Sequence, residues 1–482
     1  MAGEFLRYCQ RMGDLKVYYF LILIFSTLST ISLSLYTFHP EDNILISAGS
    51  VSGSSFYNRY FLPDDHRSNP NSPLLSSCPS TAVSAFDRSS DILFDVHRSA
   101  RIFTKRSKYA FKVKDSGIHI VRLHFFPFLA SDLDLSDALF HVLIDGYVAL
   151  TNFSISGSLA IKEYFIPVHD NVLTIEFVPV NKGNFAFVNA IEIISAPKDL
   201  IPDRATLVKD GELVKFTSLA LETVHRFNVG GSLVTPFNDT LWRTWVPDDL
   251  VYKSVNISKR VFFSGQIHYI DGGASREVAP DFVYKTGRVI SSENDSVPDV
   301  KMTWEIPIAK SCKYLVRLHF CDIASTALYM INFNVYVNGY LATERLDLSS
   351  AWNALAAPAY KDFVLDSGNS AVLAISIGPS NESIAHSIDG ILNGIEVMKM
   401  NNSMGSLDGE VSVHMILRNW RGKDLSTSLQ LLAAIILLMT ASFILYKRVI
   451  GCKHNMAWTR LPTSSPELSL KHSIPNSATT KV

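Results

Sequence analysis

The sequence predicts an all-β ectodomain of two tandem β-sandwiches followed by a single transmembrane helix. Three observations support this prediction. Short blocks of alternating apolar residues recur in the same order in both halves of the chain, one apolar run near the C-terminus is long enough to cross a bilayer, and aromatic residues make up 11% of the 482 residues. Aromatic side chains favour half-buried pleated surfaces, so the composition favours strands over helices.

The charge balance argues against some classes of protein. There are 44 Lys and Arg against 45 Asp and Glu, which gives a formal net charge of −1. This balance argues against a polybasic nucleic-acid binder and against an acidic disordered tail. Hydrophobic residues reach 47% while charged residues are 18%, below the roughly 25% of ordinary soluble domains. The composition therefore leaves room for large cores and for a membrane-inserted segment.

Residues 1–34 have the pattern of a secretory signal peptide. Arg7, Arg11 and Lys16 precede an apolar stretch at residues 17–33, and small residues allow cleavage after Ser34. An uncleaved signal anchor is the alternative, because the apolar stretch is long for a signal peptide. Either interpretation directs the following chain out of the cytosol.

Residues 425–446 are predicted to be the transmembrane helix. The only ionisable group in this run is the phenol of Tyr446. About 22 residues rise about 33 Å as a helix, which is enough for a hydrocarbon core of about 30 Å. Basic residues flank the run on both sides, so the orientation follows from the signal peptide and predicts a single-pass type I protein.

Residues 447–482 are expected to form a short cytoplasmic tail, which is too short for an independent domain. Cys452 lies close to the span, where reversible palmitoylation is feasible. An ordinary reduced thiol is the alternative. The other cysteines are few and scattered, which argues against a disulfide framework, and Cys312 and Cys321 lie at opposite ends of one predicted strand and are not expected to pair.

Glycosylation sites agree with this topology. Asn-x-Ser/Thr motifs occur between the signal peptide and the span and do not occur in the tail. The predicted acceptors are Asn152, Asn238, Asn256, Asn294, Asn381 and Asn401. Glycans at these positions would cover part of the ectodomain surface and restrict where a partner can bind.

An internal repeat organises the ectodomain. Four blocks occur twice in the same order, about 193 to 204 residues apart. They are residues 121–125 and 316–320 (both Val-Arg-Leu-His-Phe), 144–147 and 337–340, 172–175 and 372–375, and 189–193 and 393–397. The order and the slowly changing offset indicate one fold copied twice, with loops of different length.

The alternation within the blocks predicts strands with one buried face. Val121, Leu123 and Phe125 point one way while the intervening Arg and His point the other way. Asp-Gly or Asn-Gly lies within the second block of each copy and predicts a hairpin turn. Short strands at regular spacing indicate a β-sandwich for each copy. The predicted domains are residues 40–198 and 218–400, with a boundary near residues 195–202.

Longer motifs in the second copy carry a family resemblance. Residues 222–231 (Glu-Thr-Val-His-Arg-Phe-Asn-Val-Gly-Gly) and 235–247 (Thr-Pro-Phe-Asn-Asp-Thr-Leu-Trp-Arg-Thr-Trp-Val-Pro) are the most specific, joined by residues 279–284, 316–323 and 392–397. The chain resembles the tandem malectin-like ectodomain of plant receptor-like kinases of the FERONIA and THESEUS type. The resemblance extends from about residue 42 to residues 458–462.

The resemblance implies a plant cell-surface protein at the plasma membrane, with its ectodomain in the apoplast. It also implies an extracellular peptide or cell-wall polysaccharide as ligand. The 482 residues contain no Gly-rich ATP loop, no His-Arg-Asp motif and no Asp-Phe-Gly motif. We therefore expect a kinase-less receptor-like protein that acts as co-receptor or decoy beside a kinase-bearing family member. The alternatives are a carbohydrate-binding wall tether without a signalling role and a truncated product of a receptor kinase gene.

Two groups of residues are candidates for ligand contacts. Trp242, Arg243 and Trp245 could stack against a sugar ring, although a packing or domain-interface role is the favoured interpretation. His124 and His319 occupy the same position in their two copies, and this equivalence favours a structural role over catalysis. We therefore expect a binding surface and not a catalytic site.

Other motifs do not indicate an enzyme or a bound cofactor. Asp132, Asp134 and Asp137 lack the Gly and terminal Glu of a calcium loop, so a solvated loop is favoured over a weak cation site. Gly49 and Gly53 lack a phosphate-binding context and are predicted to be turn residues. No local spacing singles out a glycosidase carboxylate pair. We therefore expect no catalytic residues, no cofactor and no metal.

Overall fold

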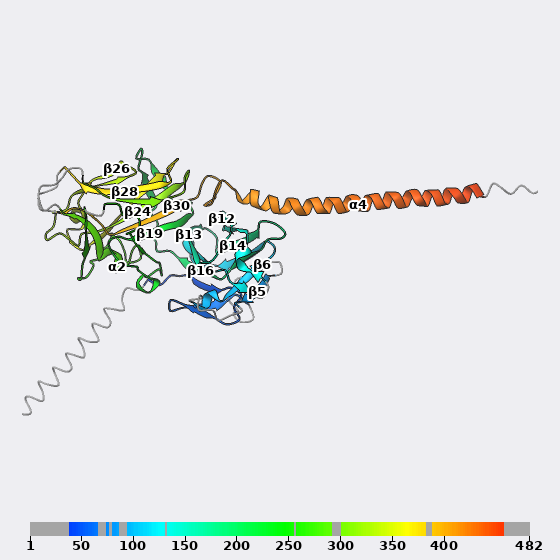
Figure 1. Cartoon of the computed structure of the whole chain (residues 1–482), viewed down its shortest axis with the longest axis horizontal. Coiled ribbons are helices and arrows are strands. Elements are labelled where there is room, and N and C mark those ends of the chain that lie inside the picture. Colours follow the sequence, from blue (N-terminus) through cyan, green and yellow to red (C-terminus); the bar gives the residue numbers. More distant parts are fainter. Residues whose placement is uncertain are drawn as a thin grey trace, which may run out of the picture. The chain divides into compact units, whose positions relative to one another are not determined.

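The computed structural model describes residues 38–65, 74–76, 80–85, 94–130, 133–254, 257–291, 300–381 and 388–456 (Figure 1). The predicted signal peptide, the tail beyond 456, and Asp132, Asn256 and Asn294 lie outside these residues. The chain divides into two compact units, Met1–Ile416 and Leu417–Val482. The first unit contains both repeats. We call residues 43–195 copy 1 and residues 221–400 copy 2.

Copy 1 consists almost entirely of strands. They are β1 (Asn43–Ser47), β2 (Ser54–Phe56), β3 (Arg59–Pro63), β4 (Leu74–Ser76), β5 (Ser80–Ser84), β6 (Ser99–Phe103), β7 (Ser107–Lys112), β8 (Gly117–Phe125), β9 (Leu129–Ala130), β10 (Leu133–Asp134), β11 (Phe140–Ile144), β12 (Tyr147–Phe153), β13 (Ala160–Val168), β14 (Val172–Pro179), β15 (Ala186–Val188) and β16 (Ala190–Ser195). Two short 3₁₀ turns, η1 (Asp95–His97) and η2 (Leu135–Asp137), connect them.

The linker and copy 2 follow the same plan. Their elements are β17 (Arg204–Leu207), β18 (Leu213–Lys215), β19 (Leu221–Asn228), η3 (Pro236–Asn238), β20 (Val246–Pro247), β21 (Lys259–Phe262), α2 (Asp281–Tyr284), β22 (Thr286–Ser291), β23 (Met302–Pro307), β24 (Lys313–Cys321), β25 (Phe333–Val337), β26 (Tyr340–Leu346), α3 (Leu348–Trp352), β27 (Pro358–Asp366), β28 (Val372–Pro379), β29 (Ile388–Leu392) and β30 (Gly394–Met400). The all-β prediction for the ectodomain is confirmed.

Each copy is a sandwich, and the inner sheets of the two sandwiches are continuous. Within the described residues, a 13-stranded sheet runs in the order β18-β17-β27-β24-β30-β19-β13-β8-β16-β1-β3-β2, with β20 beside β19. Strand β13 of copy 1 pairs with β19 of copy 2 through Tyr164–Glu222 and Phe165–Leu221. The outer sheets stay separate: β12-β11-β14-β7-β4 covers copy 1 and β23-β28-β25-β26 covers copy 2.

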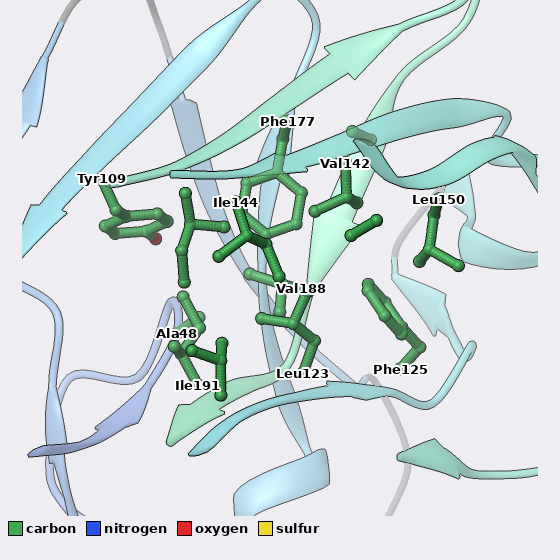
Figure 2. Close-up of a cluster of buried hydrophobic side chains, with 14 of the residues drawn as sticks. Ala48, Tyr109, Leu123, Phe125, Val142, Ile144, Leu150, Phe177, Val188 and Ile191 are labelled. Atoms are coloured by element: carbon green, nitrogen blue, oxygen red, sulfur yellow. The ribbon is translucent and has the colours of Figure 1, made fainter. Parts of the chain in front are cut away.

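A hydrophobic core fills each sandwich. In copy 1, Leu123 and Phe125 of the inner sheet face Val142 and Phe177 of the outer sheet (Figure 2). Copy 2 has an equivalent core that contains Trp304, Phe320 and Phe333. Burying a large apolar side chain contributes about 1.5 to 3 kcal/mol, so these cores supply the main favourable term for folding.

The predicted hairpin turns are confirmed in both copies. Asp145 and Gly146 have φ values of 46° and 85°, and Asn338 and Gly339 have values of 49° and 81°. Two successive residues with positive φ form the turn that suits a two-residue β-hairpin, and Asp-Gly and Asn-Gly tolerate this conformation best. The turns join β11 to β12 and β25 to β26.

The prediction that these strands bury only one face is wrong. Ile120 lies on the opposite face of β8 from Val121, yet both side chains are 0% exposed. Leu315 and Val316 of β24 are likewise both buried. A third cluster covers this second face with Leu200, Phe216, Met398 and other residues from the linker and both copies. The intervening Arg and His residues are therefore interior groups that need partners inside the protein.

The second unit is helical. Helix α4 (Val413–Met456) contains one segment, Leu429–Ile450, that is long and apolar enough to cross a membrane, with a mean hydropathy of 2.2. This segment begins and ends four residues later than the predicted span at 425–446. Its large apolar side chains, such as Leu437 and Met439, are 69% and 70% exposed, which suits contact with lipid.

Candidate functional site

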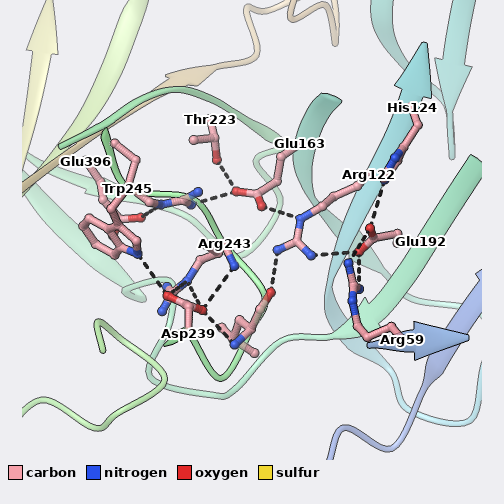
Figure 3. Close-up of polar contacts among 12 residues, drawn as sticks. Arg59, Arg122, His124, Glu163, Glu192, Thr223, Asp239, Arg243, Trp245 and Glu396 are labelled. Carbon is pink, nitrogen blue, oxygen red and sulfur yellow. Dashed lines mark hydrogen bonds and ion pairs between the residues drawn. The ribbon is translucent and has the colours of Figure 1, made fainter. Parts of the chain in front are cut away.

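A buried polar network extends through the second face of the inner sheet, where copy 1 meets copy 2 (Figure 3). At its copy 1 end, Glu192 of β16 forms a bidentate pair with Arg59 of β3, at 2.7 and 2.8 Å. Glu192 also accepts hydrogen bonds from Arg122 Nη1 at 2.8 Å and His124 Nε2 at 2.9 Å. These four side chains are nearly inaccessible to solvent, so their charges need partners inside the protein.

Copy 2 has the equivalent groups with different partners. Glu396 of β30 accepts from Arg226 Nε at 2.6 Å and from His319 Nε2 at 3.1 Å. Arg317, which corresponds to Arg122, forms a bidentate pair with Asp362 at 2.7 Å for both bonds. His319 also contacts the Tyr284 hydroxyl through Nδ1 at 3.1 Å. The repeat therefore places one acid, one arginine and one histidine in each copy.

Three hydrogen bonds carry the network across the boundary between the copies. Arg226 of copy 2 donates to Glu163 of copy 1 at 2.7 Å, and Thr223 donates to the same carboxylate at 2.7 Å. Arg122 of copy 1 donates through Nη2 to the Leu241 carbonyl of copy 2 at 2.7 Å. Charged hydrogen bonds of this kind are strong and directional, so they fix how the two copies meet.

The electrostatics keep the acids of the network ionised. Burial raises the pKa of Glu163, but Arg226 and Arg122 outweigh burial and bring the pKa to about 2. The same balance, with Arg59 and Arg122 as the cations, holds the pKa of Glu192 well below its usual range. A carboxylate that stays ionised beside arginines cannot serve as a general acid near neutral pH. The arrangement is suited to holding the two copies together.

Burial disfavours the charged form of the histidines in the network. Burial lowers the pKa of His124 and His319, and the nearby glutamates only partly offset this effect. His97, whose Nε2 lies 3.1 Å from His124 Nδ1, has its pKa lowered to about 3 by burial and by His124. The structural interpretation of His124 and His319 therefore agrees with their burial and contacts.

The structure buries two of the three residues proposed for sugar stacking. Trp245 is 0% exposed and Arg243 is 2% exposed. Asp239 accepts from both, at 3.0 Å from Arg243 Nε and 2.9 Å from Trp245 Nε1. Trp242 is half-buried, and its ring lies 4.9 Å from the Arg59 guanidinium carbon. Trp245 is therefore closed to a sugar ring, and Arg59 lies over the ring of Trp242.

A polar cleft of about 500 Å³ opens in copy 1. The loop at residues 50–55, with four serines, forms one wall, and Asp95, Arg98 and Ser99 contribute to the other. Gly49, just before this loop, has a φ of 71°, and a Cβ there would lie 2.1 Å from the Ala100 carbonyl oxygen. Its role as a turn residue follows from both facts.

The glycosylation acceptors differ in accessibility. Asn152, Asn238 and Asn381 are exposed. Asn401 is half-buried, and its side chain accepts from Ala220 N at 2.8 Å and donates to Asn402 O at 2.9 Å. A glycan on Asn401 would require this amide nitrogen to leave its partner. Asn256 and Asn294 lie outside the described residues.

The remaining sequence candidates have local roles. Asp134 caps η2 by accepting from Ser136 N at 2.9 Å, and Asp137 lies in that turn. Among the described residues, no group of three or more His, Cys, Asp or Glu is arranged to hold a metal ion. Cys312 and Cys321 are both free thiols, as expected, and burial raises the pKa of Cys321. Cys452 belongs to α4.

Several network residues were not predicted from the sequence. Glu192 and Glu396 occupy matching positions in the repeated blocks, so a repeated acid inside an apolar strand was the available signal. Arg59 lies outside the repeat and is about 130 residues from its partner Glu192. No local pattern predicts that pairing, because it depends on β3 joining the sheet beside β1.

Comparison with known proteins agrees with this fold. The model of the malectin-like domain family matches residues 75–400. A probable receptor-like protein kinase of Arabidopsis thaliana is 42% identical over 392 residues, and Receptor-like protein kinase THESEUS 1 of the same plant is 38% identical over 409 residues. These matches cover 80% and 83% of this chain and 47% of each kinase, so the chain spans about half the length of these relatives.

Solved ectodomains match most of this chain in three dimensions. The Arabidopsis thaliana ANXUR1 extracellular domain has a TM-score of 0.68 at 27% identity, over 77% of this chain and 99% of that chain. The plant receptor-like kinase FER has a TM-score of 0.66 at 29% identity over the same shares. A third structure, with a TM-score of 0.66 at 28% identity, contains the plant peptide RALF23 in complex with FER and LLG2, and it covers the same shares.

Proposed function

Because the chain belongs to the malectin-like domain family, we propose that its ectodomain is a plant cell-surface receptor module that binds an extracellular peptide at the plasma membrane. The observation that carries this proposal is the likeness to the FER ectodomain in complex with RALF23 and LLG2, which spans 99% of that chain. The single apolar helix Leu429–Ile450 would hold the module at the membrane, with the ectodomain in the apoplast.

The surface of copy 2 supports a binding role. Phe262, Phe282 and Tyr329 are 72%, 51% and 56% exposed. Exposed aromatic side chains are enriched at protein interfaces, where they supply contact area at a low cost in conformational entropy. The buried network between the copies would keep this surface rigid, which reduces the entropy lost on binding.

Peptide binding is tested with the full chain in lipid nanodiscs. Labelled synthetic RALF23 is titrated in the presence and absence of LLG2, with a peptide of scrambled sequence as the control. We expect saturable binding of RALF23, or of another member of a panel of secreted plant peptides, at micromolar concentration or below. Failure of the whole panel to bind folded protein would contradict the proposal.

A second part of the proposal concerns signalling. The kinase motifs absent from these 482 residues would be supplied by a kinase-bearing family member, with this chain acting as co-receptor or decoy. Co-expression with such a kinase distinguishes the two roles, because a co-receptor raises ligand-induced phosphorylation and a decoy lowers it. Unchanged phosphorylation would contradict both.

The wall-tether alternative has less support. Its proposed contacts, Arg243 and Trp245, are buried and engaged by Asp239. The exposed polar cleft beside residues 50–55 is a place where a polysaccharide could bind. Binding of the full chain to a pectin and glucan array, abolished by Ser54→Trp in this cleft, would favour the tether over the receptor.

A further inference from the structure

The outer sheets of the two copies end in equivalent edge strands, β12 and β26 (Figure 1). In copy 1, β11 and β12 pair through Val142–Leu150, Leu143–Val148 and Ile144–Tyr147, with two register shifts. In copy 2, β25 and β26 pair through Val335–Thr343, Tyr336–Leu341 and Val337–Tyr340, with register shifts at the same places. The two hairpins therefore present the same backbone groups to their outer edges.

The chain itself covers the outer edge of β12. Residues 402–409, which follow the last strand of copy 2, pass alongside Val148, and Ser406 forms a parallel bridge with it. Val148 N donates to Gly405 O at 2.9 Å, and Leu407 N donates to Val148 O at 2.8 Å. The Leu407 side chain is 2% exposed and belongs to the core of copy 1. The segment thus acts as an added strand.

An acidic side chain completes this contact. Asp408 accepts from Thr151 N at 2.6 Å and from Thr151 Oγ1 at 3.0 Å. The contact shields the central side chains of β12, where Val148 is 0% exposed and Leu150 is 4% exposed.

The outer edge of β26 has no such cover among the residues that the structure describes. No strand or isolated bridge in that part of the chain pairs with it. Leu341, the counterpart of Val148, is 49% exposed, and Tyr340 is 44% exposed. By the shared register, the N–H and C=O of Leu341 point away from β25, as those of Val148 point away from β11. An uncovered edge with exposed apolar side chains is a template for strand addition.

Charge at the edge specifies the occupant. The position of Thr151, which binds Asp408 in copy 1, is taken in copy 2 by Glu344, which is exposed. An acidic residue beside Glu344 would be repelled, and a basic residue would be attracted. The two register shifts do not prevent docking, because the same irregularity in β12 coexists with its added strand.

We propose that the outer edge of β26, at residues 340–344, is a docking site where an extended segment of a peptide ligand adds as a parallel strand. The segment carries an apolar residue in the place that Leu407 takes on β12, followed by Lys or Arg beside Glu344. Strand addition supplies affinity through main-chain hydrogen bonds and specificity through alternate side chains. This inference rests on the proposed peptide-binding function and assigns it a location.

The test uses the full chain in nanodiscs and two labelled octapeptides. One copies residues 402–409 of this chain (Asn-Ser-Met-Gly-Ser-Leu-Asp-Gly), and the other carries lysine in place of the aspartate. Fluorescence anisotropy measures affinity, and hydrogen exchange locates the contact. We expect the lysine peptide to bind about fivefold more tightly or better and to slow exchange at residues 340–344. Equal affinity of the two peptides, or no protection there, would overturn the proposal.

Three variants of β26 sharpen the result. Leu341→Pro removes the outward N–H and should weaken the lysine peptide about fivefold, because an edge strand tolerates proline where its N–H faces solvent. Leu341→Ala keeps that N–H and should weaken binding less than Leu341→Pro does. Glu344→Lys leaves the backbone intact and should reverse the preference between the two peptides, so it decides the matter if Leu341→Pro does not fold. An unchanged preference in Glu344→Lys would contradict the site.

Failure of this site and failure of the proposed function give different results. If a secreted peptide binds the wild-type chain and Glu344→Lys equally and leaves residues 340–344 unprotected, the receptor function stands and the edge site is wrong. If the lysine octapeptide protects residues 340–344 with the expected charge preference while no secreted peptide binds, the edge site stands and the receptor function is wrong.

Discussion

In copy 1, Glu192 accepts hydrogen bonds from two arginines and one histidine, whereas in copy 2 the equivalent Glu396 accepts from one arginine and one histidine. The additional cation, Arg59, comes from β3, which extends the sheet beyond β1. The edge strands differ in a similar way, because β12 is covered by residues 402–409 while the outer edge of β26 has no pairing strand among the described residues.

These differences show that the repeated blocks supply a common framework and that segments outside them complete it. Arg59 and Leu407 both lie outside the four repeated blocks, yet both are buried or nearly so in copy 1. A duplicated fold can therefore acquire distinct interfaces without changes in its core strands. Four pairs of substitutions, each comparing the two copies, test this interpretation.

The largest effect is expected for Glu192→Gln compared with Glu396→Gln. The first change leaves the buried Arg59 without a carboxylate partner, although Arg122 stays paired with Glu163. The second change leaves no arginine alone, because Arg226 stays paired with Glu163. Breaking a buried ion pair costs about 3 to 5 kcal/mol, so Glu192→Gln should lower the free energy of unfolding by about 4 kcal/mol and Glu396→Gln by about half as much. Urea unfolding measures both, and equal losses would contradict the difference described for the two networks.

The next largest change in stability is expected at the two edge strands. Leu407→Ala removes a side chain that is 2% exposed and should lower the free energy of unfolding by about 3 kcal/mol. Leu341→Ala, on the equivalent but open strand, should change it by less than about 0.5 kcal/mol. Hydrogen exchange at Val148 should also become faster in Leu407→Ala. Similar losses for the two alanine variants would show that β26 is covered in the intact protein.

The histidines predict a difference in acid sensitivity. Because burial and His124 lower the pKa of His97 to about 3, the unfolded chain takes up a proton at this residue before the folded chain does. Stability should therefore fall as pH drops below about 6.5, and His97→Gln should reduce the slope between pH 6 and pH 4 by about 1.4 kcal/mol per unit. Tyr284→Phe, at the matching contact with His319, is the control and should leave the slope unchanged. Thermal unfolding at a series of pH values measures the slope for both variants. Parallel profiles of stability against pH for wild type and His97→Gln would show that His97 is not a source of the acid sensitivity.

The smallest effect is expected where the copies are alike. Gly146→Ala and Gly339→Ala place a Cβ at φ values of 85° and 81°, in turns where no described atom lies within 4 Å of that Cβ. Each change should cost about 1 kcal/mol through backbone strain alone, and the two costs should agree within about 0.5 kcal/mol. Unequal costs in thermal unfolding would show that the two turns differ in their surroundings.

The sequence by itself determined the features that depend on local patterns. Alternation of apolar residues predicted the strands, the Asp-Gly and Asn-Gly pairs predicted both hairpin turns, and the repeat predicted two sandwiches of one fold. An apolar run near the C-terminus predicted a helix whose bounds lie within four residues of the segment that is long and apolar enough to cross a membrane. Such features are visible in sequence because each depends on residues that are close together in the chain.

Only the tertiary structure decided what the second face of each inner strand does. Arg122 and His124 alternate with apolar residues, which is the pattern of a solvated face, but both are buried. Leu241 of copy 2 contacts Arg122, while Phe56, Phe61 and His97 of copy 1 pack against His124. Their partners Glu192 and Leu241 lie 70 and 119 residues away. No local pattern encodes such pairings, because a buried charge is stable only when the complete fold brings its counter-charge within hydrogen-bond distance.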